Sequence, residues 1–139
     1  MSQTCIGLLG IGHEATGDFY QRLIGRLQQL YVLQANYDYP QIILNAIPTP
    51  SLVGDSVADL NPFIKGIKQL ESAGAEFIVM VCNTIHLFYN DLARAVDVPI
   101  LDWRKEVFDY LQTQNLGVVT VMGTPLTMSE GLYEFEDIE

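Results

Sequence analysis

The sequence has few basic residues and few cysteines. Seven Lys and Arg side chains stand against 17 Asp and Glu among 139 residues, so the net charge is −10 at pH 7. Binding to nucleic acid or to an anionic membrane surface requires clustered basic side chains, and we therefore expect neither partner. The two cysteines, Cys5 and Cys82, make no disulfide framework, which is typical of a cytoplasmic protein in a reducing compartment.

Long hydrophobic segments are also missing. No apolar run approaches the roughly 20 residues that span a bilayer, so we expect no transmembrane helix. Residues 1–4 lack a basic region and the apolar run at residues 6–11 is short, so we expect no signal peptide. A composition with 49% hydrophobic and 17% charged residues instead predicts a globular chain that buries its own core.

What the sequence does contain is a regular alternation of strand and helix patterns. Short apolar runs typical of buried strands occupy residues 5–11, 41–47, 76–81, 97–101 and 116–122. Helical spacing of apolar residues predicts helices over residues 14–33, from 56 or 61 to 73, over 84–95, over 102–112 with Asp102 as the cap, and from about 126. Strands that alternate with helices predict an α/β fold, an open parallel sheet with flanking helices.

A partial internal repeat bears on the domain organisation. The order of strand, glycine, threonine and tyrosine that runs from Gly7 to Tyr20 returns between Gly117 and Tyr133. Self-similarity of this kind indicates that one structural unit has been copied. We therefore expect one α/β domain in residues 1–113. Residues 114–139 are expected to form the first strand and helix of a truncated second domain of similar fold.

Cys82 is the strongest candidate for a chemically active residue. It follows the apolar run of residues 77–81, and parallel sheets bind their ligands just beyond the carboxyl ends of the strands. A helix that begins directly after it would favour the thiolate form. Asn83 and Thr84 interrupt the apolar pattern, either to cap that helix or to bind a ligand. The alternative is that Cys82 is a buried small hydrophobic residue.

His86 follows Cys82 by one helical turn. It could tune the thiol, bind a carboxylate, coordinate a metal or serve only as a structural side chain. A zinc site made by both cysteines and both histidines is excluded, because Cys5 begins a strand and lies about 20 Å of extended chain from the far end, at ~3.3 Å per residue. A three-ligand site of His13, Cys82 and His86 stays open as an alternative, although we expect no metal.

A glycine-containing loop follows the first apolar run. Gly10-Ile11-Gly12-His13-Glu14-Ala15 matches the G-x-G-x-x-A pattern of dinucleotide-binding folds. Those folds place an acidic residue at the end of the second strand, where this chain has Asn45 and Ala46. Glycine lets a backbone approach a ligand closely, so we interpret the loop as one wall of a small-ligand site and take Gly12 as a candidate substrate contact.

Several segments together resemble the aspartate/glutamate racemase superfamily, closest to its aspartate racemase branch. They cover nearly the whole chain: Ile6–Gly10 with Glu14–Tyr20, Asn45–Pro50, Ile78–His86 continuing to Val98–Leu101, and Gly123–Thr124 with Gly131–Glu134. The resemblance implies an aspartate/glutamate racemase-like, flavodoxin-like half and a cofactor-independent amino-acid racemase. In that family two cysteines from two similar domains flank the substrate α-carbon. One thiolate removes the α-proton, and the opposite thiol returns a proton to the other face.

The functional residues of the family carry over onto one part of this chain. Cys82 matches the first-domain catalytic cysteine, and Asn83 and Thr84 match residues that bind the substrate α-carboxylate. The remaining expected substrate contacts are Thr124, Gly12 and His86. The resemblance implies a small amino-acid or dicarboxylate substrate, no cofactor and a homo-oligomer, most simply a dimer.

The chain also departs from the family pattern. The second-domain cysteine has no counterpart, and Ser51 and Leu52 stand where aspartate-specific members carry Asp-Arg, whose arginine holds the side-chain carboxylate. One hypothesis is therefore a racemase half with one catalytic cysteine, which two chains could complete by opposing their Cys82 thiols across a twofold axis. The alternatives are a non-catalytic carboxylate-binding module and another reaction of the superfamily, decarboxylation or cis–trans isomerisation of a diacid.

Overall fold

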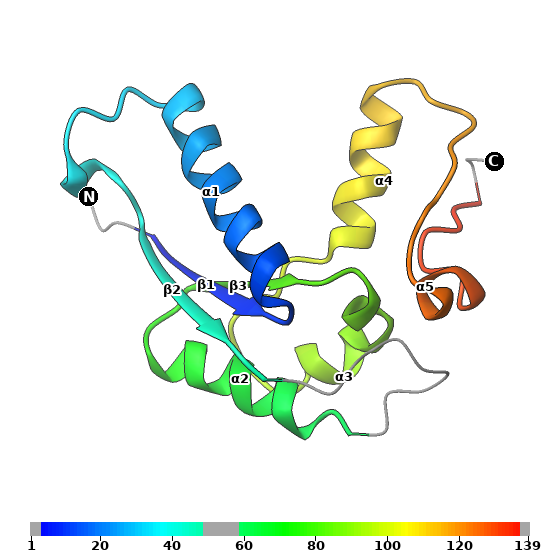
Figure 1. Cartoon of the computed structure of the whole chain (residues 1–139), viewed down its shortest axis with the longest axis horizontal. Coiled ribbons are helices and arrows are strands. Elements are labelled where there is room, and N and C mark those ends of the chain that lie inside the picture. Colours follow the sequence, from blue (N-terminus) through cyan, green and yellow to red (C-terminus); the bar gives the residue numbers. More distant parts are fainter. Residues whose placement is uncertain (1–3, 49–58, 137–139) are drawn as a thin grey trace.

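The computed structural model describes residues 4–48 and 59–136. At its centre is a parallel sheet of three strands in the order β2-β1-β3 (Figure 1). The strands are β1 (Cys5–Gly10), β2 (Gln41–Ala46) and β3 (Phe77–Val81). β1 is the middle strand and pairs with both neighbours, which explains why its sequence is an unbroken apolar run. The open parallel α/β sheet expected from the sequence is confirmed.

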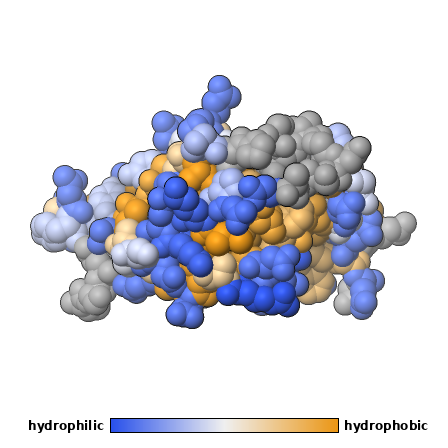
Figure 2. Space-filling view, turned by 90° about the horizontal axis from the view of Figure 1, so that it is seen from below, coloured by the Kyte–Doolittle hydropathy of each residue, from blue (hydrophilic) through white to orange (hydrophobic). Residues whose placement is uncertain are grey.

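Helices lie on both sides of the sheet. α1 (His13–Leu30) and α4 (Trp103–Thr113) rise on one side, and α2 (Asn61–Ser72) and α3 (Tyr89–Ala93) lie on the other (Figure 1). Figure 2 shows the side of α2 and α3, where hydrophilic side chains border a band of hydrophobic ones. The described chain also contains the 3₁₀ turns η1 (Asn36–Asp38) and η2 (Thr84–Phe88) and a short helix α5 (Pro125–Ser129). No helix within these ranges is long and apolar enough to cross a membrane.

The core lies between the sheet and α2. Phe63, Ile67 and Leu70 are buried, and their spacing of three and four residues places them on one face of the helix. Burial of each such side chain contributes about 1.5–3 kcal/mol. Gly66 lies on the same face, and a Cβ added to it would lie only 2.6 Å from Cδ1 of Leu9. The absence of a side chain at this position therefore allows α2 to approach β1 closely.

The start of α4 follows its sequence signal more closely than the end of α1 does. α1 ends at Leu30 rather than at residue 33, because Tyr31 already takes an extended conformation. α4 begins as expected, since the side chain of Asp102 accepts a hydrogen bond from the Arg104 amide at 3.1 Å. Such a cap satisfies one of the free amides of the first helical turn.

The bounds of α2 also follow local signals. The helix begins at Asn61, with Pro62 in its first turn, where proline is tolerated. The other start that the sequence suggested, Ser56, lies outside the described residues. Gly74 follows the helix at φ +97°, a left-handed conformation that favours glycine, so it ends α2 close to the predicted residue 73.

The prediction of a single helix over residues 84–95 is wrong in its details. The segment forms the 3₁₀ turn η2 and then the short helix α3. Thr84, Ile85 and His86 are all buried, whereas a regular surface helix would turn at least one of three successive side chains toward solvent. Burial of this run against the core, α4 and α5 thus prevails over the helical periodicity.

The fourth predicted strand, residues 97–101, is reduced to one bridge. Ile100 pairs with Ile78 of β3 in parallel, through bonds from the Ile78 amide to Pro99 O (2.9 Å) and from the Leu101 amide to Ile78 O (2.8 Å). Proline lacks an amide hydrogen, and the chain turns into α4 directly after Asp102, so the ladder cannot extend.

The fifth predicted strand, residues 116–122, is not formed among the described residues. The segment carries no sheet pairing. Leu116, Val118 and Met122 are 45%, 70% and 92% exposed. A strand exists only where a neighbouring strand accepts its backbone hydrogen bonds, and no described strand lies beside this segment.

Candidate active site

The candidate site lies where the carboxyl ends of β1 and β3 meet, since Gly10 and Val81 are partners in the sheet. Cys82 follows Val81 directly and is partly buried. Its amide donates to the carbonyl oxygen of Met80 at 2.9 Å, which turns the chain sharply out of the strand. The thiol is therefore at the strand end predicted from the sequence, in the position where parallel sheets bind ligands.

Opposing effects act on the thiol of Cys82. Burial raises its pKa, and hydrogen bonds from the Ile85 amide, the Thr84 amide and the Thr84 hydroxyl lower it. The balance leaves the pKa above that of a free thiol. The amides of the following turn do lower the pKa of the thiol, as expected from the sequence. Burial raises that pKa by more than the amides lower it. Burial therefore favours the thiol over the thiolate.

A cluster of threonine hydroxyls joins the Cys82 loop to α5. The Oγ1 atom of Thr84 lies 2.8 Å from that of Thr127 and 3.1 Å from that of Thr124, and the last two lie 3.0 Å apart. Thr84 and Thr127 are buried, and Thr124 caps α5 by accepting from the Thr127 amide at 3.3 Å. The fold thereby brings together Thr84 and Thr124, which the sequence analysis named separately.

Asn83 is held by a residue that the sequence analysis did not name as a site residue. The hydroxyl of Tyr133 donates to Oδ1 of Asn83 at 2.5 Å, across 50 residues of chain. Burial raises the pKa of Tyr133, so this hydroxyl stays protonated and remains a donor. The available signal was the recurrence of Tyr133 at the end of the internal repeat, which by itself indicates no contact with Asn83.

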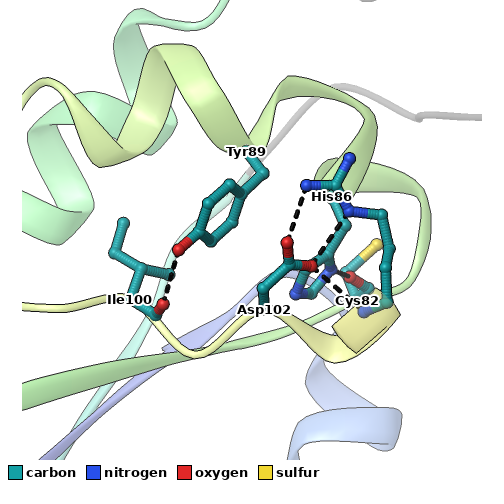
Figure 3. Close-up of polar contacts among 6 residues, drawn as sticks. Cys82, His86, Tyr89, Ile100 and Asp102 are labelled. Carbon is teal, nitrogen blue, oxygen red and sulfur yellow. Dashed lines mark hydrogen bonds and ion pairs between the residues drawn. The ribbon is translucent and has the colours of Figure 1, made fainter. Parts of the chain in front are cut away.

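The side chain of His86 is hydrogen-bonded to the backbone of Cys82. Its Nδ1 atom is 2.8 Å from the carbonyl oxygen of Cys82. A carbonyl can only accept, so Nδ1 carries the hydrogen; Figure 3 shows both residues. The ring is fully buried and stacks on Trp103, with 5.3 Å between centroids. Burial lowers the pKa of His86, which keeps the imidazole neutral. No described residue bonds its buried Nε2 atom.

An ion pair lies beside His86, at the start of α4. Arg104 binds Asp102 through two nitrogens of its guanidinium group, with Nε–Oδ1 at 2.9 Å and Nη2–Oδ2 at 2.7 Å. Burial alone would raise the pKa of Asp102, but the hydrogen bonds from Arg104 outweigh it and hold that pKa below its ordinary value. The guanidinium also lies 5.2 Å from the ring centroid of Tyr89. Asp102 is thus fixed as a carboxylate near the imidazole.

The glycine loop begins α1. The carbonyl oxygen of Gly12 accepts from both the amide (2.8 Å) and the hydroxyl (2.6 Å) of Thr16. The close approach that needs glycine is at Gly10, where a Cβ would lie 2.7 Å from the Thr16 side chain. At Gly12 an added Cβ would meet only Ala15, at 3.9 Å. Gly12 stays a predicted substrate contact on the exposed side of the loop.

The structure does not support the alternative of a metal site. Among residues 4–48 and 59–136, no group of three or more His, Cys, Asp or Glu side chains could hold a metal ion. His13, Cys82 and His86 therefore do not form the three-ligand site. Ser51 and Leu52, which stand in place of the family's Asp-Arg, lie outside the described residues.

Comparisons with known proteins point to one family. Residues 6–136 match the model of the Asp/Glu/hydantoin racemase family. The chain is similar to the broad specificity amino-acid racemase RacX of Bacillus subtilis (strain 168), with 31% identity over 134 residues that cover 93% of this chain and 58% of that protein.

Solved structures give the same result. An aspartate racemase homologue from Pyrococcus horikoshii OT3 superposes with a TM-score of 0.76 at 28% identity, over 96% of this chain and 58% of the other. The aspartate racemase of Picrophilus torridus superposes with a TM-score of 0.74 at 25% identity, over 94% of this chain and 56% of the other. The chain thus spans less than two thirds of the length of these relatives. Because the family match extends over nearly all of its residues, the chain belongs to the Asp/Glu/hydantoin racemase family.

Proposed function

We propose that this chain supplies one half of an amino-acid racemase site, in which Cys82 exchanges the α-proton while Asn83 and Thr84 hold the α-carboxylate. The observation that carries the proposal is the position of the thiol. It directly follows β3, it is close to the amides of Thr84 and Ile85, and it is flanked by side chains that can donate hydrogen bonds. Membership of the family and the similarity to RacX support an amino acid as substrate.

The proposed chemistry needs these hydrogen-bond donors because the α-proton of an amino acid is hard to remove. A thiolate removes the weakly acidic α-proton only if the charge that develops on the carboxylate is stabilised. Once Cys82 has lost its own proton to solvent, the sulfur takes the α-hydrogen as a proton and becomes S–H, and the electron pair of the C–H bond passes into the carboxylate as an enediolate. Amide donors at the start of η2 and the Asn83 side chain would stabilise that enediolate.

Inversion requires a second acid on the opposite face of the α-carbon. Cys5 is unsuited to this role, because it begins β1 at the other end of the strand, buried, with its carbonyl oxygen accepting from the Glu76 amide at 2.8 Å. We propose that the acid comes from a second, similar domain that begins in residues 114–139, or from the partner's Cys82 in a homodimer. The exposed apolar side chains at Leu116, Val118 and Met122 support the domain proposal, since further strands would cover them.

Exchange of the α-proton in deuterated water tests the role of Cys82 without requiring inversion. Aspartate, glutamate and alanine, each as L and D forms, would be incubated with the protein, and loss of the α-proton signal would be followed by NMR. We expect exchange that disappears in Cys82→Ala. Cys5→Ala is the matched control, because it removes a thiol that is remote from the site and should leave exchange in place.

The outcomes separate the parts of the proposal. Equal exchange in wild type and Cys82→Ala would overturn the catalytic role of the thiol. Exchange without change of optical rotation would support a single working thiol, and racemisation would support a complete two-acid site. Sedimentation of the active sample distinguishes a dimer from a monomer; racemisation by a monomer would contradict pairing of two Cys82 thiols.

A second candidate function is a carboxylate-binding module that performs no chemistry. The observation in its favour is the partial burial of Cys82, which raises the pKa of the thiol and so disfavours the thiolate. This module would shift the amide signals of Asn83 and Thr84 on titration with aspartate, yet exchange no α-proton. We also propose a cytoplasmic location, which two free cysteines support.

A further inference from the structure

Asn83 is tied to a distant part of the chain by one short hydrogen bond. The Tyr133 hydroxyl donates to Oδ1 of Asn83 at 2.5 Å, and no described residue accepts from Nδ2 of the same amide. A side-chain amide has an accepting end and a donating end, which rotation by half a turn exchanges. A donor fixed on Oδ1 therefore decides which end of the amide faces away from Tyr133.

The segment that carries Tyr133 is held in place by aromatic packing. The Tyr133 ring packs edge-on against Phe135 at 6.3 Å between centroids, and Phe135 packs against Phe108 of α4 at 5.2 Å. Gly131 makes the turn before it at φ +60°. The bonds of Thr84 with Thr124 and Thr127 join the same two segments a second time. The hydroxyl of Tyr133 is thus delivered from a fixed position and does not reach Asn83 from a free end.

We propose that Tyr133 is a positioning residue for substrate binding: its hydroxyl fixes the Asn83 amide so that Nδ2, and not Oδ1, faces the substrate carboxylate beside Cys82. This inference rests on the proposed function, in which Asn83 binds that carboxylate. Without the tyrosine hydroxyl the amide can rotate, and in half of its orientations an oxygen would face an anion. The protein carries a net charge of −10, so an anion is attracted here only by local donors of this kind.

Alkylation of Cys82 tests the inference on the chain as it exists. Iodoacetate carries a carboxylate and iodoacetamide is its neutral counterpart, and both attack the same thiol. The readout is the ratio of their rates at Cys82, measured by peptide mass spectrometry and divided by the same ratio for N-acetylcysteine amide. A carboxylate site beside the thiol raises this normalised ratio above one. A general loosening of the fold would change both rates together.

The variants are Tyr133→Phe, Asn83→Ala and Phe135→Leu. We expect Tyr133→Phe to lower the ratio by about threefold to tenfold, the effect of one well-placed hydrogen bond, and Asn83→Ala to lower it at least as far. Phe135→Leu loosens the packing around Tyr133 but keeps the hydroxyl, so it should lower the melting temperature and change the ratio by less than Tyr133→Phe. The double variant Asn83→Ala with Tyr133→Phe should match Asn83→Ala alone, because the tyrosine acts through the amide.

Each result bears on one of the two proposals. A wild-type ratio of one that Asn83→Ala does not change would overturn carboxylate binding, and with it the proposed function. A raised ratio that depends on Asn83 but persists in Tyr133→Phe would overturn the positioning role and leave the proposed function standing. If Tyr133→Phe does not fold, the NMR shifts of the Asn83 side-chain amide in the wild type give the answer: an amide that rotates freely in the absence of ligand contradicts the inference.

Discussion

The imidazole of His86 holds the carbonyl oxygen of Cys82, with 2.8 Å between Nδ1 and that oxygen. The bond closes a turn of five residues, from Cys82 to His86. It fixes the backbone from which the amides of Thr84 and Ile85 approach the sulfur. The His86 ring is buried and stacks on Trp103, which holds this hydrogen bond in place.

Loss of the imidazole should destabilise the protein. His86→Ala removes a fully buried ring, its stacking on Trp103 and the donor to the Cys82 carbonyl. We expect a decrease of about 2–4 kcal/mol in the free energy of unfolding. His86→Asn keeps a donor near the position of Nδ1 and should lose less. Urea unfolding of both variants measures the difference; equal losses would show that the hydrogen bond contributes nothing.

The same residue should make stability depend on pH. Burial lowers the pKa of His86 below the ordinary value of about 6.5, so the unfolded chain binds this proton more readily than the folded chain. The stabilisation from a neutral His86 is complete above that value and is lost as pH falls from there toward the folded pKa. We expect the free energy of unfolding to decrease between about pH 7.5 and 5.5, a window above the titration of ordinary carboxylates. His86→Asn should flatten this dependence, whereas the exposed His13 provides a control, since His13→Asn should retain it.

The Thr84 hydroxyl should tune the reactivity of Cys82. It donates toward the thiol and lowers its pKa, against the effect of burial. Thr84→Val removes this donor at nearly constant volume, so the pKa of Cys82 should rise and alkylation by iodoacetamide at neutral pH should slow by about threefold or more. Thr84→Ser keeps the hydroxyl and is the matched control. A pH–rate profile for each variant measures the shift, and identical midpoints in Thr84→Val and wild type would rule out this hydrogen bond as a cause.

Two glycines in helices should respond in opposite directions to alanine. A Cβ on Gly66 would lie 2.6 Å from Cδ1 of Leu9, so Gly66→Ala should destabilise the packing of α2 on β1 by about 1–3 kcal/mol. Gly25 lies inside α1, and nothing lies within 4 Å of an added Cβ there. Gly25→Ala should therefore stabilise the chain by about 0.5–1 kcal/mol, the difference in helix propensity. Thermal melting of the pair checks both signs.

Much of the architecture could be predicted because its signals are local. The unbroken run of β3 marks a strand buried on both faces, and Asp102 marks the start of α4 through a bond to an amide two residues on. Gly74 ends α2 for the equally local reason of its positive φ. The two failed strands have different causes. Residues 97–101 lie beside β3, but Pro99 and the turn into α4 limit them to one bridge. Residues 116–122 have no described strand to pair with, and no local pattern reports a missing neighbour.

The sequence by itself determined the family, the order of strand and helix, and the position of Cys82 at the end of a buried strand, because each depends on residue types at short spacing. Only the tertiary structure decided how the site is assembled. Thr84 meets Thr127 across 43 residues and Asn83 meets Tyr133 across 50. The pKa of the thiol also depends on the tertiary structure. Local amides lower this pKa, but burial by the fold raises it by a larger amount. Such contacts depend on how distant segments pack, and spacing along the chain does not encode them.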